Sequence, residues 1–421
     1  MRNLRRTAGL IGTAMAATLA LGGCGSGPAA STDATTLSLW VPAGTDTIAP
    51  YVEAFNAAHP DAKVTLREIP FAQYDTALGQ AFSVGQGPDL AQINGTSMPT
   101  FASKGFLQPI TPIVGTEGDL ATDNFYPNLL KAAAYEDAQV TIPIDTGTRV
   151  LQYNKKLFAK ADVEPFGETA SYGDILAAAK KIRALGSEYQ GFCYVGGVKE
   201  YTINSNIGPV IIQSGGSFVS PDGKTATLNT PEAQAGVTFF KDLAETGSKA
   251  NIVSTSNDSC GEGFGAGTVG MQFEGFWSIP ADDAASSDFE LGQTLPKAKT
   301  VYSSTGGWVL GVPRYVKEDK HAIIKALVTD MYKPENLVKF TGLMPATKSG
   351  RDAAETLKDA KYDIYWKILN ENADNPIPLS GQLVEQGNLL TSAVQSILQG
   401  TETVPEALEK ANTAFQATLS K

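Results

Sequence analysis

Single helical stretches separate successive short strands in the first part of the chain, and this alternation is the strongest constraint on its fold. Alternating apolar positions predict the strands, and apolar residues at helical spacing predict the helices. The predicted strands are Leu37–Val41, Lys63–Ile69 and Asp89–Ile93, and the predicted helices between them are Thr47–His59 and Tyr74–Val84. Because each helix returns the chain to the start of the next strand, we expect a parallel sheet with ligands bound beyond its carboxyl ends. The loops after Trp40 and Ile93 are therefore candidate binding loops.

The remainder of the chain has the same mixed character, without an internal repeat. Strands are predicted over Val150–Tyr153, Thr268–Phe273 and Gly307–Val312, and helices over Tyr172–Leu185, Pro231–Thr246, Lys317–Tyr332, Tyr362–Asn370, Gln382–Leu398 and Val404–Leu419. A chain of 421 residues with 42 % hydrophobic content is long and apolar enough for two domains of ordinary size.

The N-terminus has the order of a secretory signal peptide. Arginines at the start precede an apolar run over Ala8–Leu21, and Leu-Gly-Gly-Cys then ends at Cys24. That run is shorter than a transmembrane helix, which needs ~20 apolar residues. Its ending resembles the lipobox of bacterial lipoproteins, in which the cysteine is acylated. We expect a signal peptide over residues 1–23, a lipid-anchored tether over 24–36 and a location outside the cytoplasmic membrane. An ordinary secretion signal with an incidental Cys24 is the alternative.

The net charge and the cysteine and histidine content limit the partners and cofactors that we expect the chain to bind. The full chain carries a formal charge of −11, and loss of the three arginines of the signal peptide would lower it to −14. Nucleic acids and anionic lipid surfaces require clustered basic residues, so neither is an expected partner. Cys193 and Cys260 are the only other cysteines, and they form either one disulfide or two buried thiols. Two histidines, His59 and His321, are too few for a Cys/His zinc site, and no cofactor is expected.

Six short motifs follow one another along the mature chain. They are Tyr74–Leu90 with its Gly-x-x-Pro-Asp ending, Phe101–Leu107, Pro143–Phe158 with Tyr-Asn-Lys-x-Leu-Phe, Phe264–Trp277, Gly306–Trp308 and Gly342–Ala346. In this order they resemble the extracellular solute-binding proteins of bacterial ABC importers, the family with maltose, oligosaccharide and glycerophosphodiester binders. The resemblance extends from about Leu37 to the C-terminus.

The resemblance implies an α/β, two-lobed periplasmic-binding-protein fold. Each lobe is expected to be a mixed sheet flanked by helices, and crossing hinge strands join the lobes, which close on a ligand. We expect residues 37–143 plus 289–312 in the first lobe and residues 144–288 plus 313–421 in the second.

Tryptophans are the first candidates for the binding site. A sugar offers apolar C–H faces to aromatic rings and hydroxyl groups to carboxylates and amides. Trp277 stands where the family places a stacking tryptophan. Trp308, with Gly307 beside it, begins a crossing strand, and Trp40 ends the first strand. For each tryptophan, packing in a core is the alternative.

Acidic and basic residues complete the polar part of the expected site. Asp145 is a candidate hydroxyl acceptor where the lobes meet, or a hinge carboxylate held by backbone N–H groups. Glu274 is either a site acid or a surface charge. Arg149 pairs with an acid in the cleft or bridges the lobes.

Two loops supply the remaining candidates. Asn94 follows the third predicted strand, and Glu200 and Tyr201 occupy the region from which related proteins contribute an acid and an aromatic residue.

These features predict a non-enzymatic, monomeric receptor that captures a di- or oligosaccharide and delivers it to an ABC permease. The alternative within transport is a glycerophosphodiester, a polyamine or an amino-acid derivative. An exported carbohydrate-active enzyme is the competitor from another class, but adjacent acids such as Asp282 and Asp283 point apart instead of facing one glycosidic bond.

Overall fold

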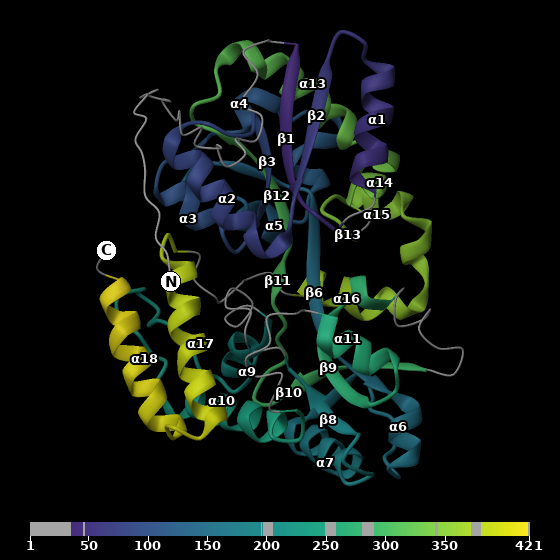
Figure 1. Cartoon of the computed structure of the whole chain (residues 1–421), viewed down its shortest axis with the longest axis vertical. Coiled ribbons are helices and arrows are strands. Elements are labelled where there is room, and N and C mark those ends of the chain that lie inside the picture. The colour runs from purple at the N-terminus through teal and green to yellow at the C-terminus, as the bar shows by residue number, and fades with distance from the viewer. Residues whose placement is uncertain are drawn as a thin grey trace, which may run out of the picture.

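The computed structural model of the chain describes residues 35–44, 47–194, 196, 205–248, 258–279, 290–341, 344–371 and 380–419. Figure 1 shows two α/β lobes, one above the other, with strands that run from one lobe to the other. The expected signal peptide and Cys24 lie outside the described residues.

The sheet of the first lobe has the strand order β2–β1–β3–β12–β4, and β5 also pairs with β12. Its strands are β1 (Thr36–Pro42), β2 (Lys63–Ile69), β3 (Leu90–Asn94), β4 (Leu107–Gln108), β5 (Thr141–Pro143) and β12 (Trp308–Pro313). β1 pairs in parallel with β2 and β3, as the alternation of strands and helices predicts, and α1 (Ile48–Ala58) and α2 (Phe71–Val84) make the connections. β12 enters the sheet antiparallel to β3.

The sheet of the second lobe has the order β7–β10–β6–β9–β8, and β11 and β13 pair with β6. Its strands are β6 (Asp145–Asn154), β7 (Thr169–Ser171), β8 (Gln190–Cys193), β9 (Val269–Gly275), β10 (Leu291–Lys297), β11 (Thr305–Gly306) and β13 (Met344–Pro345). The core of this lobe includes residues of helices α6 (Lys155–Lys160), α7 (Tyr172–Arg183), α9 (Ile207–Gln213), α10 (Pro231–Ala244), α17 (Leu383–Gln399) and α18 (Val404–Thr418).

The long strand β6 connects the two sheets. At its start, Asp145 pairs with Pro345 of β13 and Gly147 pairs with Gly306 of β11. From Arg149 onward, β6 pairs with β9 in the second sheet, and Figure 1 shows it passing from the upper to the lower lobe. Two mixed sheets flanked by helices and joined by crossing strands confirm the expected fold class.

The packing differs from the expected division of residues between the lobes. Helix α13 (His321–Met331) packs against β1, and helix α14 (Pro334–Thr341) packs against α1, and both partners are elements of the first lobe. Strand β10 pairs with β6 and β7 in the second sheet. Thus α13 and α14 belong to the first lobe and β10 to the second. Periodicity shows that a helix has an apolar face, but it does not say which sheet will cover that face.

One disulfide ties two segments of the second lobe together. Cys193 ends β8 and Cys260 lies in α11 (Asp258–Gly265), and their Cα atoms are 5.6 Å apart. Both cysteines are buried, beside Phe264 and Val269. Of the two alternatives that the sequence leaves open, the structure therefore has the bridge.

Candidate functional site

Several of the residues that the sequence singles out lie where β6 passes between the lobes. Side chains alternate along a strand, so Asp145, Gly147 and Arg149 share one face of β6. Arg149 is paired in register with Gly275 at the end of β9. The chain then turns through Trp277, whose ring lies within van der Waals reach of Gly147. We call Asp145, Arg149, Glu274, Trp277 and Trp308 the junction site.

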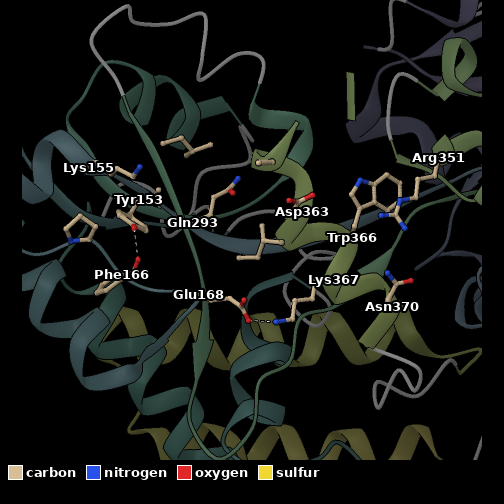
Figure 2. A pocket seen from close by; sticks show the side chains of 15 residues that line it. Tyr153, Lys155, Phe166, Glu168, Gln293, Arg351, Asp363, Trp366, Lys367 and Asn370 are labelled. Atoms are coloured by element: carbon tan, nitrogen blue, oxygen red, sulfur yellow. Dashed lines mark hydrogen bonds and ion pairs between the residues drawn. The ribbon is translucent and has the colours of Figure 1, made fainter. Parts of the chain in front are cut away.

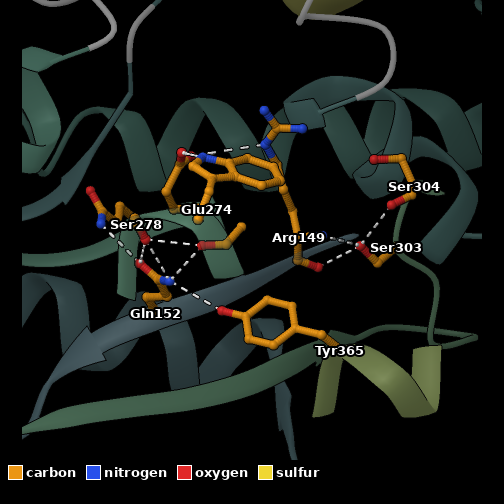
Figure 3. A network of polar contacts seen from close by, with 10 residues as sticks. Arg149, Gln152, Glu274, Ser278, Ser303, Ser304 and Tyr365 are labelled. Carbon is orange, nitrogen blue, oxygen red and sulfur yellow. Dashed lines mark hydrogen bonds and ion pairs between the residues drawn. The ribbon is translucent and has the colours of Figure 1, made fainter. Parts of the chain in front are cut away.

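Trp277 makes polar and cationic contacts in the junction site. Its Nε1–H donates to Oε1 of Glu274 at 2.5 Å. The Arg149 guanidinium carbon lies 4.7 Å from the centroid of the indole, a cation–π distance, and Arg149 Nε is 3.9 Å from Oε2 of Glu274. Figure 3 labels Arg149 and Glu274 of this group. Trp277 is half-buried, so part of the indole is accessible to a ligand.

Opposing effects act on the pKa of the Glu274 carboxyl. Desolvation raises its pKa, while the charge of Arg149 and the hydrogen bond from Trp277 act to lower it. Its side chain remains 29 % exposed, and that of Arg149 remains 20 % exposed. The pair thus offers both an acceptor and a donor at the surface of the site.

Asp145 is more deeply buried than Glu274. It is 2 % exposed, and its Oδ1 accepts the backbone N–H of Trp308 at 2.8 Å. Oδ2 has no hydrogen-bond partner among the described residues. Desolvation raises the pKa of the carboxyl to about 7, against the opposite effect of the Trp308 N–H. The backbone contact matches the hinge-carboxylate alternative, and the second oxygen is buried without a donor among the described residues.

Gly307 allows β12 to approach Asp145 closely. A Cβ atom at Gly307 would lie 2.3 Å from the backbone oxygen of Asp145 and 2.7 Å from its Oδ1. Gly307 therefore contributes to the site by leaving room for Asp145, because a side chain at this position would displace the carboxylate.

The loop after β3 joins the junction through its backbone. Asn94 is paired with Trp308, and its Oδ1 accepts the N–H of Thr96 at 2.9 Å. The N–H of Gly95 donates to the Gly307 oxygen at 2.9 Å. Asn94 thus shapes the loop with its oxygen.

Trp40 lies elsewhere, in the core of the first lobe. It is 5 % exposed and belongs to a cluster with Ile69 and Tyr74, and the Arg67 guanidinium carbon lies 4.3 Å from its ring centroid. This position favours core packing over contact with a ligand. Both faces of β1 are covered, as is usual in a parallel sheet, so the end of the strand does not expose its last aromatic residue.

Trp308 lies at the edge of the same cluster. It is half-buried, and its ring meets Phe71 and Tyr74 edge to face at centroid distances of 6.0 and 6.2 Å. Its backbone N–H holds Asp145, so Trp308 connects the aromatic cluster of the first lobe to the junction. Glu200 and Tyr201 lie outside the described residues.

A polar network that the sequence analysis missed supports the turn that carries Trp277. Nε2 of Gln152, which is fully buried, lies 2.9 Å from Ser278 Oγ and 3.1 Å from both the Gly275 oxygen and Tyr365 Oη. Figure 3 shows Gln152 together with Ser278 and Tyr365. A buried Gln in a strand predicts such a partner set in general, but its members come from distant segments.

A cavity of about 880 Å³ lies apart from the junction site. Aromatic residues Tyr153, Phe166 and Trp366 line it together with several charged side chains. Figure 2 shows that Glu168 and Lys367 of this cavity are paired with each other. No member of the junction site lines it. We therefore base the binding site on the convergence of aromatic, acidic and basic groups at β6 and not on cavity size.

Two further observations apply to the described part of the chain. It contains no group of three or more His, Cys, Asp or Glu residues that could hold a metal ion. Within it, no helix combines the length and the apolar character needed to span a membrane.

Comparison with known proteins places the chain in a family. A family model described as bacterial extracellular solute-binding protein matches residues 42–338. The diacetylchitobiose binding protein DasA of Streptomyces coelicolor is 26 % identical over 392 residues, which cover 86 % of this chain and 88 % of DasA. The sn-glycerol-3-phosphate-binding periplasmic protein UgpB of Shigella dysenteriae is 22 % identical over 392 residues, or 85 % of this chain and 86 % of UgpB.

Solved structures agree with this placement. An ABC transporter solute-binding protein of Thermotoga lettingae, bound with α-D-tagatose, superimposes with a TM-score of 0.78 at 26 % identity, covering 91 % of this chain and all of that one. The family model alone spans more than half of the chain. The protein belongs to the bacterial extracellular solute-binding proteins.

Proposed function

We propose that the protein captures a carbohydrate at the junction site and delivers it to the membrane permease of an ABC importer. In this role it binds and releases its ligand without changing it chemically. The observation that carries the proposal is the meeting of the half-buried Trp277 with the guanidinium of Arg149 and the carboxylate of Glu274 where β6 passes between the lobes. An aromatic face suits the C–H face of a sugar ring, and the charged groups suit its hydroxyls.

The relatives support a sugar and also name an alternative. DasA is named for diacetylchitobiose, and the Thermotoga lettingae protein was solved with tagatose. UgpB is named for sn-glycerol-3-phosphate, so a phosphate ester is the second candidate. In the junction site, however, the guanidinium of Arg149 is already paired with the carboxylate of Glu274. Because its guanidinium is engaged by a carboxylate, the site favours a neutral polyol over an anion.

Movement of the lobes on binding would allow the permease to distinguish the ligand-bound protein from the ligand-free protein. A ligand held by residues from both lobes favours the closed arrangement, in proportion to its difference in affinity for the two arrangements. In this structure Asp145 of β6 and Trp308 of β12 already join the lobes at 2.8 Å. A monomer anchored by lipid on Cys24 would keep this receptor next to its permease.

The test is ligand binding by the mature domain without Cys24. Thermal shift and calorimetry with diacetylchitobiose, tagatose, maltose and sn-glycerol-3-phosphate should give a response to a sugar, since a ligand at 100 times its Kd stabilises the fold by about 2.7 kcal/mol. Trp277→Ala should weaken binding about tenfold or more, because it removes the aromatic contact. Tyr189→Ala is the matched control, since Tyr189 packs beneath Lys160 outside the junction site. A response to the phosphate ester alone would replace the sugar as the ligand class.

The anchor has its own test. The full-length chain expressed in a bacterial host should sediment with membranes, and Cys24→Ala should release it or leave it unprocessed. Membrane association of a Cys24→Ala form that has lost its signal peptide, equal to that of the wild type, would refute the lipid anchor.

A further inference from the structure

The indole of Trp277 lies against two glycines from neighbouring strands. A Cβ atom at Gly275 would lie only 2.2 Å from Cη2 and from Cζ3 of the ring. A Cβ atom at Gly147 would lie 2.9 Å from Cζ3. Real Cβ atoms essentially never come within 3.0 Å of another heavy atom, so a side chain at either position would push the ring away.

The register of the strands explains why these glycines act together. Gly275 is paired with Arg149 across β9 and β6, and Gly147 precedes Arg149 by two residues on the same face of β6. The two positions therefore form a floor without side chains, bordered by Arg149. The floor is wide enough for the aromatic ring to lie on it.

Space, and not backbone conformation, accounts for glycine at both positions. Both residues lie within regular strands and neither has a positive φ angle. An alanine could adopt their backbone geometry, and glycine in a strand interior otherwise weakens the strand. A close approach by another group is the remaining reason for glycine there. At Gly275 that group is the indole, and at Gly147 it is the indole together with the Gly306 backbone oxygen, which lies 3.1 Å from the Cβ position.

Further contacts fix the ring on this floor. Glu274 accepts the indole N–H at 2.5 Å, and Gln152 binds the turn through Ser278 and the Gly275 oxygen. The Arg149 guanidinium lies over the ring. The orientation of Trp277 is thus determined from several sides before a ligand arrives, and preorganisation of this kind lowers the cost of binding.

We infer that Gly147 and Gly275 are positioning residues of the sugar site, which set the height and tilt of Trp277 without touching the ligand. This inference rests on the proposed function, because it assigns the glycines a role in the affinity of that site. It adds two residues to the site that have no side chain of their own to bind with.

The test is alanine substitution of each glycine, with Gly306→Ala as the matched control. Gly306 pairs with Gly147 across β11 and β6, yet a Cβ atom there would meet nothing within 4 Å. Gly275→Ala and Gly147→Ala should weaken binding of the sugar about tenfold, the scale of one misplaced aromatic contact, whereas Gly306→Ala should bind like the wild type. Gly147→Ala, with the milder overlap, serves if Gly275→Ala does not fold.

A double-mutant cycle separates positioning from general damage. If the glycines act through the indole, Gly147→Ala should have no further effect on affinity in a Trp277→Ala background. The near-ultraviolet circular dichroism of the ligand-free Gly147→Ala protein should also differ from that of the wild type, because the environment of Trp277 changes. Equal losses with and without Trp277, or unchanged affinity in both alanine variants, would overturn the inference. Absence of sugar binding by the wild type would instead refute the proposed function, and with it the role in affinity.

Discussion

Replacement of Asp145 by asparagine should stabilise the ligand-free protein at high pH. The carboxyl is 2 % exposed, has one hydrogen bond from Trp308 and has no partner for Oδ2 among the described residues. The nearby titratable side chain is Tyr332, whose hydroxyl donates to the Pro143 oxygen at 2.7 Å and whose pKa is itself raised by burial. Ionisation of Asp145 is therefore opposed by desolvation, and no cation among the described residues compensates for it.

The magnitude follows from the pKa. Burial raises the pKa of Asp145 from 3.8 to about 7. At about 1.4 kcal/mol per factor of ten in ionisation, the folded state loses about 4 kcal/mol relative to the unfolded chain once the carboxyl is ionised in both. Below pH 3.8 it is protonated in both states and this cost is absent. Between these values the contribution of Asp145 to stability falls as pH rises.

Asparagine keeps the Oδ1 acceptor for Trp308 and cannot ionise. Its amide NH₂ would occupy the place of Oδ2 at a cost that does not depend on pH. The free energy of unfolding of Asp145→Asn, relative to the wild type, should therefore rise by most of about 4 kcal/mol between pH 4 and pH 8. Urea unfolding of both proteins across this range measures the difference, and contributions from all other carboxyls cancel in it.

Asp222→Asn is the control. Asp222 is fully exposed, and hydrogen bonds from Ser220 and the Lys224 N–H lower its pKa. Its stabilising effect is present at high pH and is lost on acidification, so this control should change slightly in the opposite direction. A difference for Asp145→Asn that is independent of pH, or that falls as pH rises, would refute the reasoning. If Asp145 also accepts a sugar hydroxyl, the stabilised variant should bind the sugar more weakly, which is a usual conflict between stability and function.

Three further predictions concern the stability of the lobes. The double substitution Cys193→Ser, Cys260→Ser removes a disulfide across 67 residues, which is worth about 4 kcal/mol by loop-closure entropy. The variant should have a lower urea midpoint than the oxidised wild type, and dithiothreitol should not change that midpoint. Thr403→Ala breaks the capping box with Glu406 at the start of α18 and should cost about 1 kcal/mol in the same assay, with no effect on ligand affinity. Leu327→Ala, at a fully buried position of α13, should lower the free energy of unfolding by about 2–5 kcal/mol. It should also accelerate hydrogen exchange in β1 of the first lobe. Acceleration confined to the second lobe would contradict the assignment of α13 to the first lobe.

Local patterns predicted most individual elements because they depend on neighbouring residues. Lys63–Ile69 alternates and forms β2 with those bounds, and helical spacing located α1 and α2 to within a few residues. The strand predicted over Val150–Tyr153 is longer in the structure, where β6 begins at Asp145. Its first half pairs with β11 and β13, and those partners are more than a hundred residues away in the chain.

The candidate site was only partly predictable for the same reason. The sequence pattern of a tryptophan at the end of a strand is the same whether its ring contacts a ligand or packs in a core. In the structure Trp40 is buried. Gly147 and Gly275 carry no side-chain signal, and their role depends on an indole that reaches them across two strands. Gln152 is a polar residue of the predicted strand Val150–Tyr153, and only the tertiary structure places Ser278 and Tyr365 around it.

The sequence by itself therefore determined the parallel βαβ start, the family motifs and the identity of the two cysteines that could pair, since each depends on order along the chain. Only the tertiary structure decided which lobe covers α13, α14 and β10, which tryptophan remains accessible, and how Asp145 comes to lie beneath the Trp308 N–H. These outcomes depend on which distant surfaces exclude water together. The free energy of that exclusion depends on pairs of segments, so it cannot be predicted from the local pattern of either segment alone.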